Sequence, residues 1–147
     1  MQDKPLVSII CLCYNHEKYV VETLQSVINQ SYSNIELIIV DDYSSDNSKD
    51  VIVNWLKDYP EIQFIANNVN LGNTKSFNKA FQLSKGEYII DLAADDVLLT
   101  NCVAKQLNGF KNSKFENIGL IYGNAELISE NGTFISYYFA LKIGRAS

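Results

Sequence analysis

Hydrophobic runs and amphipathic stretches alternate along this chain of 147 residues. Runs of mostly apolar residues are typical of buried strands, and stretches whose apolar residues recur every three or four positions are typical of helices with one buried face. The runs predict strands at residues 6–13, 35–40, 62–66, 87–92 and 119–122. The stretches predict helices at residues 17–30, between Asn47 and Pro60, at about 74–84, and around Val103, Leu107 and Phe110.

Cap and turn residues predict where one helix begins and where a hairpin forms. Asn47 and Asp50 have the spacing of a helix N-cap residue and its reciprocal partner. Residues 127–138 contain Asn131-Gly132 between two apolar stretches. Because Asn-Gly favours tight hairpin turns, this segment predicts a β-hairpin.

The order of the elements predicts the fold class. Strand and helix patterns alternate in four successive units before the hairpin. This alternation implies a mostly parallel sheet with helices on both faces. We therefore expect an α/β protein with a Rossmann-like, mostly parallel sheet flanked by helices and followed by a C-terminal β-hairpin.

Composition narrows the class of protein further. The length and the hydrophobic fraction of 47% fit one compact domain. The net charge of -5 argues against nucleic acid as a partner, but it allows a nucleotide whose phosphates are held through a divalent cation. Three cysteines without paired spacing indicate reduced thiols and a cytoplasmic protein, with Cys11 and Cys13 as small core residues. No apolar stretch approaches the roughly 20 residues of a transmembrane segment.

Polar clusters follow the carboxyl ends of the predicted strands. They lie at residues 14–17, 41–46, 70–75 and 95–96. Each cluster alone has a simpler interpretation, since an acid can cap a helix or solvate a loop and Lys75 can be a solvated charge. In an open α/β sheet, however, ligands bind outside the carboxyl ends of the strands. Four polar ends together therefore favour one shared ligand cleft.

Two of these ends carry adjacent acids, Asp41-Asp42 and Asp95-Asp96. A pair of carboxylates suits Mn²⁺ or Mg²⁺, which is usually held by one or two carboxylates together with substrate phosphates. Such a cation neutralises a diphosphate and makes it a better leaving group. The carboxylate of Asp42 is suited to accept hydrogen bonds from a ring N–H and from sugar hydroxyls.

Five segments match one family in order and spacing. They are Val7-Ser-Ile-Ile-Cys-Leu-Cys-Tyr-Asn15, Ile38-Ile-Val-Asp-Asp-Tyr-Ser-Ser-Asp46, Asn70-Leu-Gly72 with Asn78, Lys85-Gly-Glu-Tyr-Ile89 and Ala94-Asp-Asp96. Together they resemble the N-terminal half of a family 2 glycosyltransferase over roughly residues 5–125. The resemblance implies a GT-A fold, a nucleotide-diphosphate sugar donor (typically a UDP-sugar) and a divalent metal. It also implies inverting transfer to a saccharide or lipid-linked acceptor, as in polysaccharide biosynthesis.

The resemblance also implies roles for individual residues. Tyr14 would pack beside the nucleobase and Asp42 would hydrogen-bond it, while Asp95 would lie near the ribose and diphosphate. The full set of donor-binding residues is Tyr14, Asn15, Glu17, Asp42, Lys75 and Asp95, with Asp96 as the metal ligand.

Three positions depart from the family's common pattern. Leu12-Cys13 stands where the family often has Pro-Thr, and Ser76-Phe77-Asn78 where Ala-Arg-Asn is frequent. Ala94 stands at the first position of the Asp-x-Asp-type metal motif, so it supplies no extra carboxylate.

Inverting transfer also needs a general base for the acceptor hydroxyl. In the family this carboxylate lies well downstream, and Glu116, Glu126 and Glu130, the acids after the metal motif, do not match its position. We therefore expect residues 1–147 to be a single nucleotide-sugar-binding domain, truncated before the acceptor and catalytic-base region. The catalytic residues are thus unknown and expected beyond residue 147. The full-length protein is expected in the cytoplasm, including the inner face of the membrane.

Two other functions compete with this one. The first is a binding-only or inactive domain that keeps the fold without performing transfer. The second is a phospho-receiver signalling domain, which also places acids at strand ends. Receivers carry their acid pair after the first strand, whereas here the pairs follow the second and fourth.

Overall fold

The structure is a computed structural model that describes residues 4–138 of the chain. Residue contacts divide it into two compact units, the first ending at Ala104 and the second beginning at Lys105. The prediction of one nucleotide-sugar-binding domain stays a prediction.

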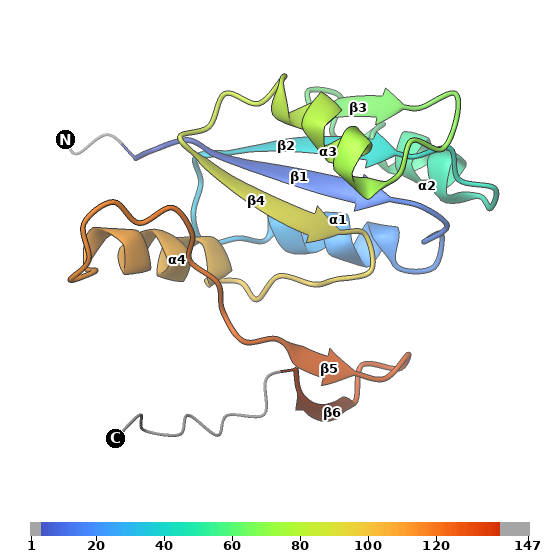
Figure 1. The fold of residues 1–147 in the computed structure, drawn as a ribbon. Coiled ribbons are helices and arrows are strands. Elements are labelled where there is room, and N and C mark those ends of the chain that lie inside the picture. Colours follow the sequence, from blue (N-terminus) through green and yellow to red (C-terminus); the bar gives the residue numbers. More distant parts are fainter. Residues whose placement is uncertain (1–3, 139–147) are drawn as a thin grey trace. The chain divides into compact units, whose positions relative to one another are not determined.

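The first unit contains a four-stranded sheet in the order β3-β2-β1-β4. All its neighbouring strands are parallel. The strands are β1 (Val7–Cys13), β2 (Ile35–Asp41), β3 (Gln63–Ala66) and β4 (Tyr88–Ala93). The helices are α1 (Val20–Ile28), α2 (Ser48–Trp55), α3 (Asn73–Phe81) and α4 (Cys102–Lys111), the last of which crosses the boundary between the units. Figure 1 shows α3 on one side of the sheet and α1 on the other, which confirms the predicted α/β layering.

The position of β1 in the core explains why its sequence is a continuous apolar run. β1 lies between β2 and β4 and is buried along its whole length. Alternate side chains of a strand point to opposite faces of the sheet. One face forms a core cluster in which Ile10 and Leu12 of β1 pack with β2 and with Ala80 of α3. Cys11 and Cys13 are buried in the same strand, as predicted, and burial raises the pKa of both thiols.

The strand order identifies the point at which successive strands are added on opposite sides of β1. β2 and β3 are added on one side of β1, and β4 returns to the other side. The carboxyl ends of β1 and β4 therefore form the topological switch point, where open α/β sheets bind ligands. The order also excludes the receiver alternative, because the doubly wound receiver sheet has the order 2-1-3-4-5.

The start of α2 differs from the prediction. Asn47 stands before the helix but makes no side-chain cap. Its side-chain amide instead donates to Glu17 Oε2 at 2.8 Å, and Asp46 Oδ1 accepts the Ser48 N–H at 2.9 Å. Asn47 therefore occupies the predicted N-cap position, but the predicted side-chain cap is absent, and its amide is held by the charged carboxylate of Glu17.

The second unit contains the predicted hairpin. β5 (Glu126–Ile128) and β6 (Phe134–Tyr137) are antiparallel, and Gly132 in the turn has a positive φ of 80°. The predicted strand at residues 119–122 is wrong, since this segment pairs with no strand in the part of the chain that the structure describes. A strand forms only where a neighbouring backbone can pair with it, which an apolar run alone does not ensure.

Gly86 provides a test of how β4 joins the sheet. Its N–H donates to Ser8 Oγ at 2.8 Å, and a Cβ added there would lie 2.5 Å from both the N and the Oγ of Ser8. Gly86→Ala is expected to lower the free energy of unfolding by about 2 kcal/mol, measured by urea denaturation, because the backbone of β1 must move. Gly119→Ala, with open space around the new methyl group, is the control. Equal losses in the two variants would contradict this close approach.

Candidate functional site

The predicted polar clusters come together at the carboxyl edge of the sheet. Backbone hydrogen bonds extend the pairing beyond the strands, from Asp42 N–H to the Cys13 carbonyl at 2.9 Å and from Ala94 N–H to the Leu12 carbonyl at 3.0 Å. A third joins Asn67 N–H to the Asp41 carbonyl at 2.9 Å. The loops after all four strands therefore begin side by side at one edge (Figure 1).

Asp42 is the most constrained of the candidate residues. Only 6% of its surface is exposed. Its Oδ1 accepts hydrogen bonds from Asn67 Nδ2, Leu71 N–H and Ser76 Oγ at 2.8–2.9 Å. Its Oδ2 accepts the Gly72 N–H at 2.8 Å. The β3–α3 loop and the first turn of α3 therefore close over this carboxylate.

The charge of Asp42 follows from these contacts. Burial opposes ionisation, but the hydrogen bonds from Leu71, Asn67, Ser76 and Gly72 outweigh it and hold the pKa of Asp42 below its ordinary value. The group is thus an ionised carboxylate that can only accept hydrogen bonds. The structure leaves its predicted contact with a nucleobase untested.

Asn15 interlocks the loops after β1 and β2. It takes a left-handed backbone conformation, with φ of 61°. Its N–H donates to Ser44 Oγ at 3.0 Å, and its Oδ1 accepts the Ser45 N–H at 2.8 Å and the Asp46 N–H at 3.4 Å. Its side-chain oxygen is therefore directed at the neighbouring loop, and its predicted place in the donor pocket stays a prediction.

Glu17 makes a second set of contacts between the same loops. Its Oε2 accepts both the N–H and the side-chain amide of Asn47 at 2.8 Å, and its own N–H donates to Asp46 Oδ2 at 3.1 Å. Like Asn15, it supports the loop that follows Asp42. A direct contact of Glu17 with a donor stays a prediction.

Tyr14 and Lys75 lie in accessible positions. Tyr14 follows β1 directly and is 47% exposed, so its ring can receive a planar group. Lys75 is exposed in the first turn of α3. A cation in that turn is disfavoured by the helix dipole, which suits a nearby anion. Neither predicted role is tested by the structure.

His16 brings the ends of β1 and β4 together. Its Nε2 lies 3.7 Å from Asp95 Oδ2, and its N–H donates to Ser48 Oγ at 2.8 Å. His16 lies within the predicted polar cluster 14–17, although its sequence position predicted no individual role for it. The signal available was its position directly after Tyr14-Asn15, as the chain's single histidine.

Asp95 and Asp96 remain exposed at the end of β4. Partial burial and then the neighbouring charge of Asp95 raise the pKa of Asp96, while His16 acts in the opposite direction. The part of this shift that comes from Asp95 is a repulsion between two carboxylates, which a cation would relieve.

The side chains available as metal ligands can be compared with the coordination that a divalent cation needs. Within residues 4–138 there is no group of three or more His, Cys, Asp or Glu side chains placed to hold a metal ion. A closed protein cage is therefore excluded for that range. Mg²⁺ and Mn²⁺ need only one or two carboxylates when phosphates and water complete the shell. The exposed acids after β4 fit this second arrangement.

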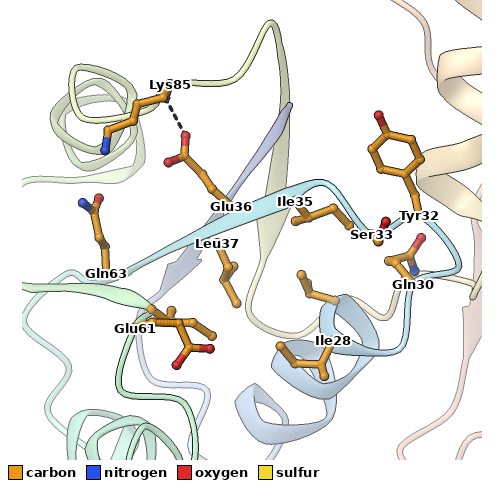
Figure 2. A pocket seen from close by; sticks show the side chains of 12 residues that line it. Ile28, Gln30, Tyr32, Ser33, Ile35, Glu36, Leu37, Glu61, Gln63 and Lys85 are labelled. Carbon is orange, nitrogen blue, oxygen red and sulfur yellow. Dashed lines mark hydrogen bonds between the residues drawn. The ribbon is translucent and has the colours of Figure 1, made fainter. Parts of the chain in front are cut away.

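A groove of about 560 Å³ lies at the opposite edge of the sheet. Among the lining residues labelled in Figure 2 are Ile35 and Leu37, from the first half of β2, together with Ile28 and Glu61. The strands enter the sheet here, so this groove contains none of the candidate residues.

The chain matches a known family along most of its length. The sequence profile of glycosyl transferase family 2 matches residues 8–133. A relative from Methanocaldococcus jannaschii, an uncharacterised glycosyltransferase, is 35% identical over 138 residues, which cover 92% of this chain and 47% of that protein. A UDP-Glc:α-D-GlcNAc-diphosphoundecaprenol β-1,3-glucosyltransferase of Escherichia coli is 32% identical over 137 residues, 91% of this chain and 52% of that one. The chain thus spans about half the length of these relatives.

Solved structures share the fold. A mannosyltransferase from Pyrobaculum calidifontis, in complex with GDP-Man and Mn²⁺, superposes with a TM-score of 0.67 at 22% identity, over 72% of this chain and 32% of that one. The S. aureus protein TarS (residues 1–349) in complex with UDP-GlcNAc gives 0.65 at 22% identity, over 86% and 41%. At this identity the likeness establishes the fold alone, and it confirms the predicted GT-A architecture. No helix within residues 4–138 has the length and apolar character needed to span a membrane.

The Asp42 contacts predict a pH-dependent loss of stability in Asp42→Asn. The amide nitrogen of Asn cannot accept a buried N–H, so the free energy of unfolding should fall by about 2 kcal/mol near neutral pH. The folded pKa of Asp42 lies below its unfolded value of about 3.9, so its contribution is complete above that value and is lost as the pH falls through the folded pKa.

Urea denaturation at neutral pH and below about pH 4 tests this. The gap between wild type and variant should narrow in acid. Asp58→Asn, on an exposed carboxylate, is the control. A gap of constant size would show that the charge of Asp42 does not contribute.

Proposed function

The chain belongs to glycosyltransferase family 2, and on that premise we propose that it binds a UDP-sugar donor together with a divalent cation. The observation that carries this proposal is the order of groups along the carboxyl edge. Asp42 follows β2, Tyr14 follows the central β1, and the acids Asp95 and Asp96 follow β4. Neighbouring strands lie about 4.8 Å apart, so an extended nucleoside diphosphate can span from the first group to the last.

The hydrogen bonds of Asp42 support uracil as the base at one end. A carboxylate offers about four lone-pair sites, and protein donors direct three hydrogen bonds to Oδ1 and one to Oδ2. Oδ2 accepts only one of these bonds, so its second acceptor site would take the ligand. The ring N–H of uracil needs a single acceptor, whereas guanine presents two adjacent donors along its pairing edge. Tyr14 would then cover the face of the base.

The acids after β4 would serve the diphosphate end. Asp96 would hold the cation, Mn²⁺ or Mg²⁺, and Asp95 would face the ribose and diphosphate. When bound, the cation supplies charge neutralisation that makes the diphosphate a better leaving group. Lys75 would add a positive charge to the donor site from the first turn of α3. Asn15 and Glu17 would act at this site by holding the loop between Asp42 and α2.

We propose an acceptor for a protein of the length of the matched relatives, of which this chain spans about half. Two matched proteins of Escherichia coli act, by their names, on a GlcNAc-diphosphoundecaprenol acceptor, and a matched protein of Bacillus subtilis is named for teichuronic acid biosynthesis. We propose inverting transfer to a saccharide or lipid-linked acceptor in polysaccharide biosynthesis, in the cytoplasm at the inner face of the membrane. No described residue is assigned as the general base.

A thermal-shift panel of nucleotide sugars, with and without Mn²⁺, tests the donor. A ligand that binds the native state raises the melting temperature by mass action. UDP-sugars with Mn²⁺ should raise it more than GDP-, CDP- or ADP-sugars. An unchanged melting temperature with every donor would contradict the proposed function.

Asp96→Ala tests the metal assignment. Titration calorimetry should show at least a tenfold weaker affinity for UDP with Mn²⁺, and an unchanged affinity for UDP alone, because only the cation-linked contact is removed. Asp58→Ala, an exposed acid after α2, is the matched control. Unchanged UDP–Mn²⁺ affinity in Asp96→Ala would show that the metal binds elsewhere.

A further inference from the structure

Three buried polar side chains form a closed hydrogen-bonded ring beneath the loop that follows β3. They are Asp42, Asn67 and Ser76, which are 6%, 6% and 0% exposed. Asn67 Nδ2 donates to Asp42 Oδ1 at 2.8 Å and to Ser76 Oγ at 2.9 Å. Ser76 Oγ donates in turn to Asp42 Oδ1 at 2.8 Å. The two amide protons and the hydroxyl proton are thus all used, and the carboxylate receives two of them.

Lys79 reinforces the orientation of this ring, which the acceptor-only carboxylate of Asp42 also favours. Its Nζ donates to Asn67 Oδ1 at 2.8 Å. An ammonium group only donates, so it requires the carbonyl end of the Asn67 amide to face it. The NH₂ end must then face Asp42 and Ser76. Without Lys79 the carbonyl end of the amide loses its partner, so Asn67 is held less firmly against Asp42 and Ser76.

The ring and the backbone of the loop together leave Asp42 little rotational freedom. With Leu71 N–H, the ring places three donors on Oδ1, while Gly72 N–H engages Oδ2. A buried network in which every donor has a partner specifies one geometry, because every alternative leaves a buried donor unpaired. The remaining acceptor site of Oδ2 is therefore held in one direction.

We propose that Lys79, Asn67 and Ser76 are positioning residues that aim the Asp42 carboxylate at the nucleobase and so select uracil over cytosine. This inference rests on the proposed function. A fixed carboxylate accepts the N3–H of uracil but meets the N3 lone pair of cytosine, which repels it. A carboxylate that can rotate reaches the exocyclic amino group of cytosine instead. Loosening the ring should therefore reduce discrimination between the two bases.

The experiment compares UDP and CDP binding in the presence of Mn²⁺ by titration calorimetry on the 147-residue chain. Lys79→Met removes the ammonium group from an exposed side chain, and Ser76→Ala removes the hydroxyl from the ring. Each should lower the ratio of UDP to CDP affinity about fivefold or more, the effect of one hydrogen bond. Thermal melts confirm that each variant is folded at the titration temperature.

Two matched controls separate selection from stability. Lys57→Met breaks another lysine–asparagine hydrogen bond, from Nζ to Asn54 Oδ1 at 3.0 Å. Ser84→Ala removes a hydroxyl that bonds the Phe81 carbonyl at 2.7 Å. Both should leave the affinity ratio unchanged. A ring that served only the fold would lower the melting temperature in Lys79→Met and Ser76→Ala without changing this ratio.

The outcomes distinguish this inference from the function on which it rests. A wild-type chain that binds neither nucleotide overturns the proposed function, and the positioning role with it. A wild-type chain that prefers UDP, with Lys79→Met retaining that preference within twofold, overturns the positioning role alone. Should Ser76→Ala fail to fold, the exposed Lys79 decides the question by itself.

Discussion

The carboxylate of Asp42 is the group on which the carboxyl edge of the sheet depends. It is buried directly after β2, where an ionised group is stable only if hydrogen-bond donors face it. The occupants come from the loop after β3 and from α3, namely Asn67, Leu71, Gly72 and Ser76. The need to satisfy one charge thus sets the path of that loop, and the same donors set the geometry of the candidate site.

The carboxylates at the two ends of the site are stabilised in different ways. Around Asp42 the charge is closed in by protein donors, and the neighbouring loops are interlocked by Asn15 and Glu17. At the end of β4 the acids Asp95 and Asp96 stay exposed, with His16 nearby. A pre-organised end suits recognition of a base, and an open acidic end suits a cation that arrives with its phosphates.

The predictions that failed share one physical cause. Asn47 has the spacing of a cap, yet its amide bonds Glu17, and residues 119–122 have the composition of a strand without forming one. Both patterns describe what a segment can do locally. Which partner it meets depends on another segment, and a charged acceptor or a missing neighbouring backbone overrides the local preference.

Local patterns in the sequence were enough to predict the alternating elements, the parallel sheet, the hairpin at Asn131-Gly132 and the gathering of polar clusters at one edge. Periodicity and turn chemistry are local, and the carboxyl ends of parallel strands coincide. The contacts of Asn67 and Ser76 with Asp42 could not be predicted in this way, because they join residues 25 and 34 positions apart and depend on how the chain folds. Spacing along the sequence does not predict such pairs. They form when loops fold around a buried charge that needs hydrogen-bond donors.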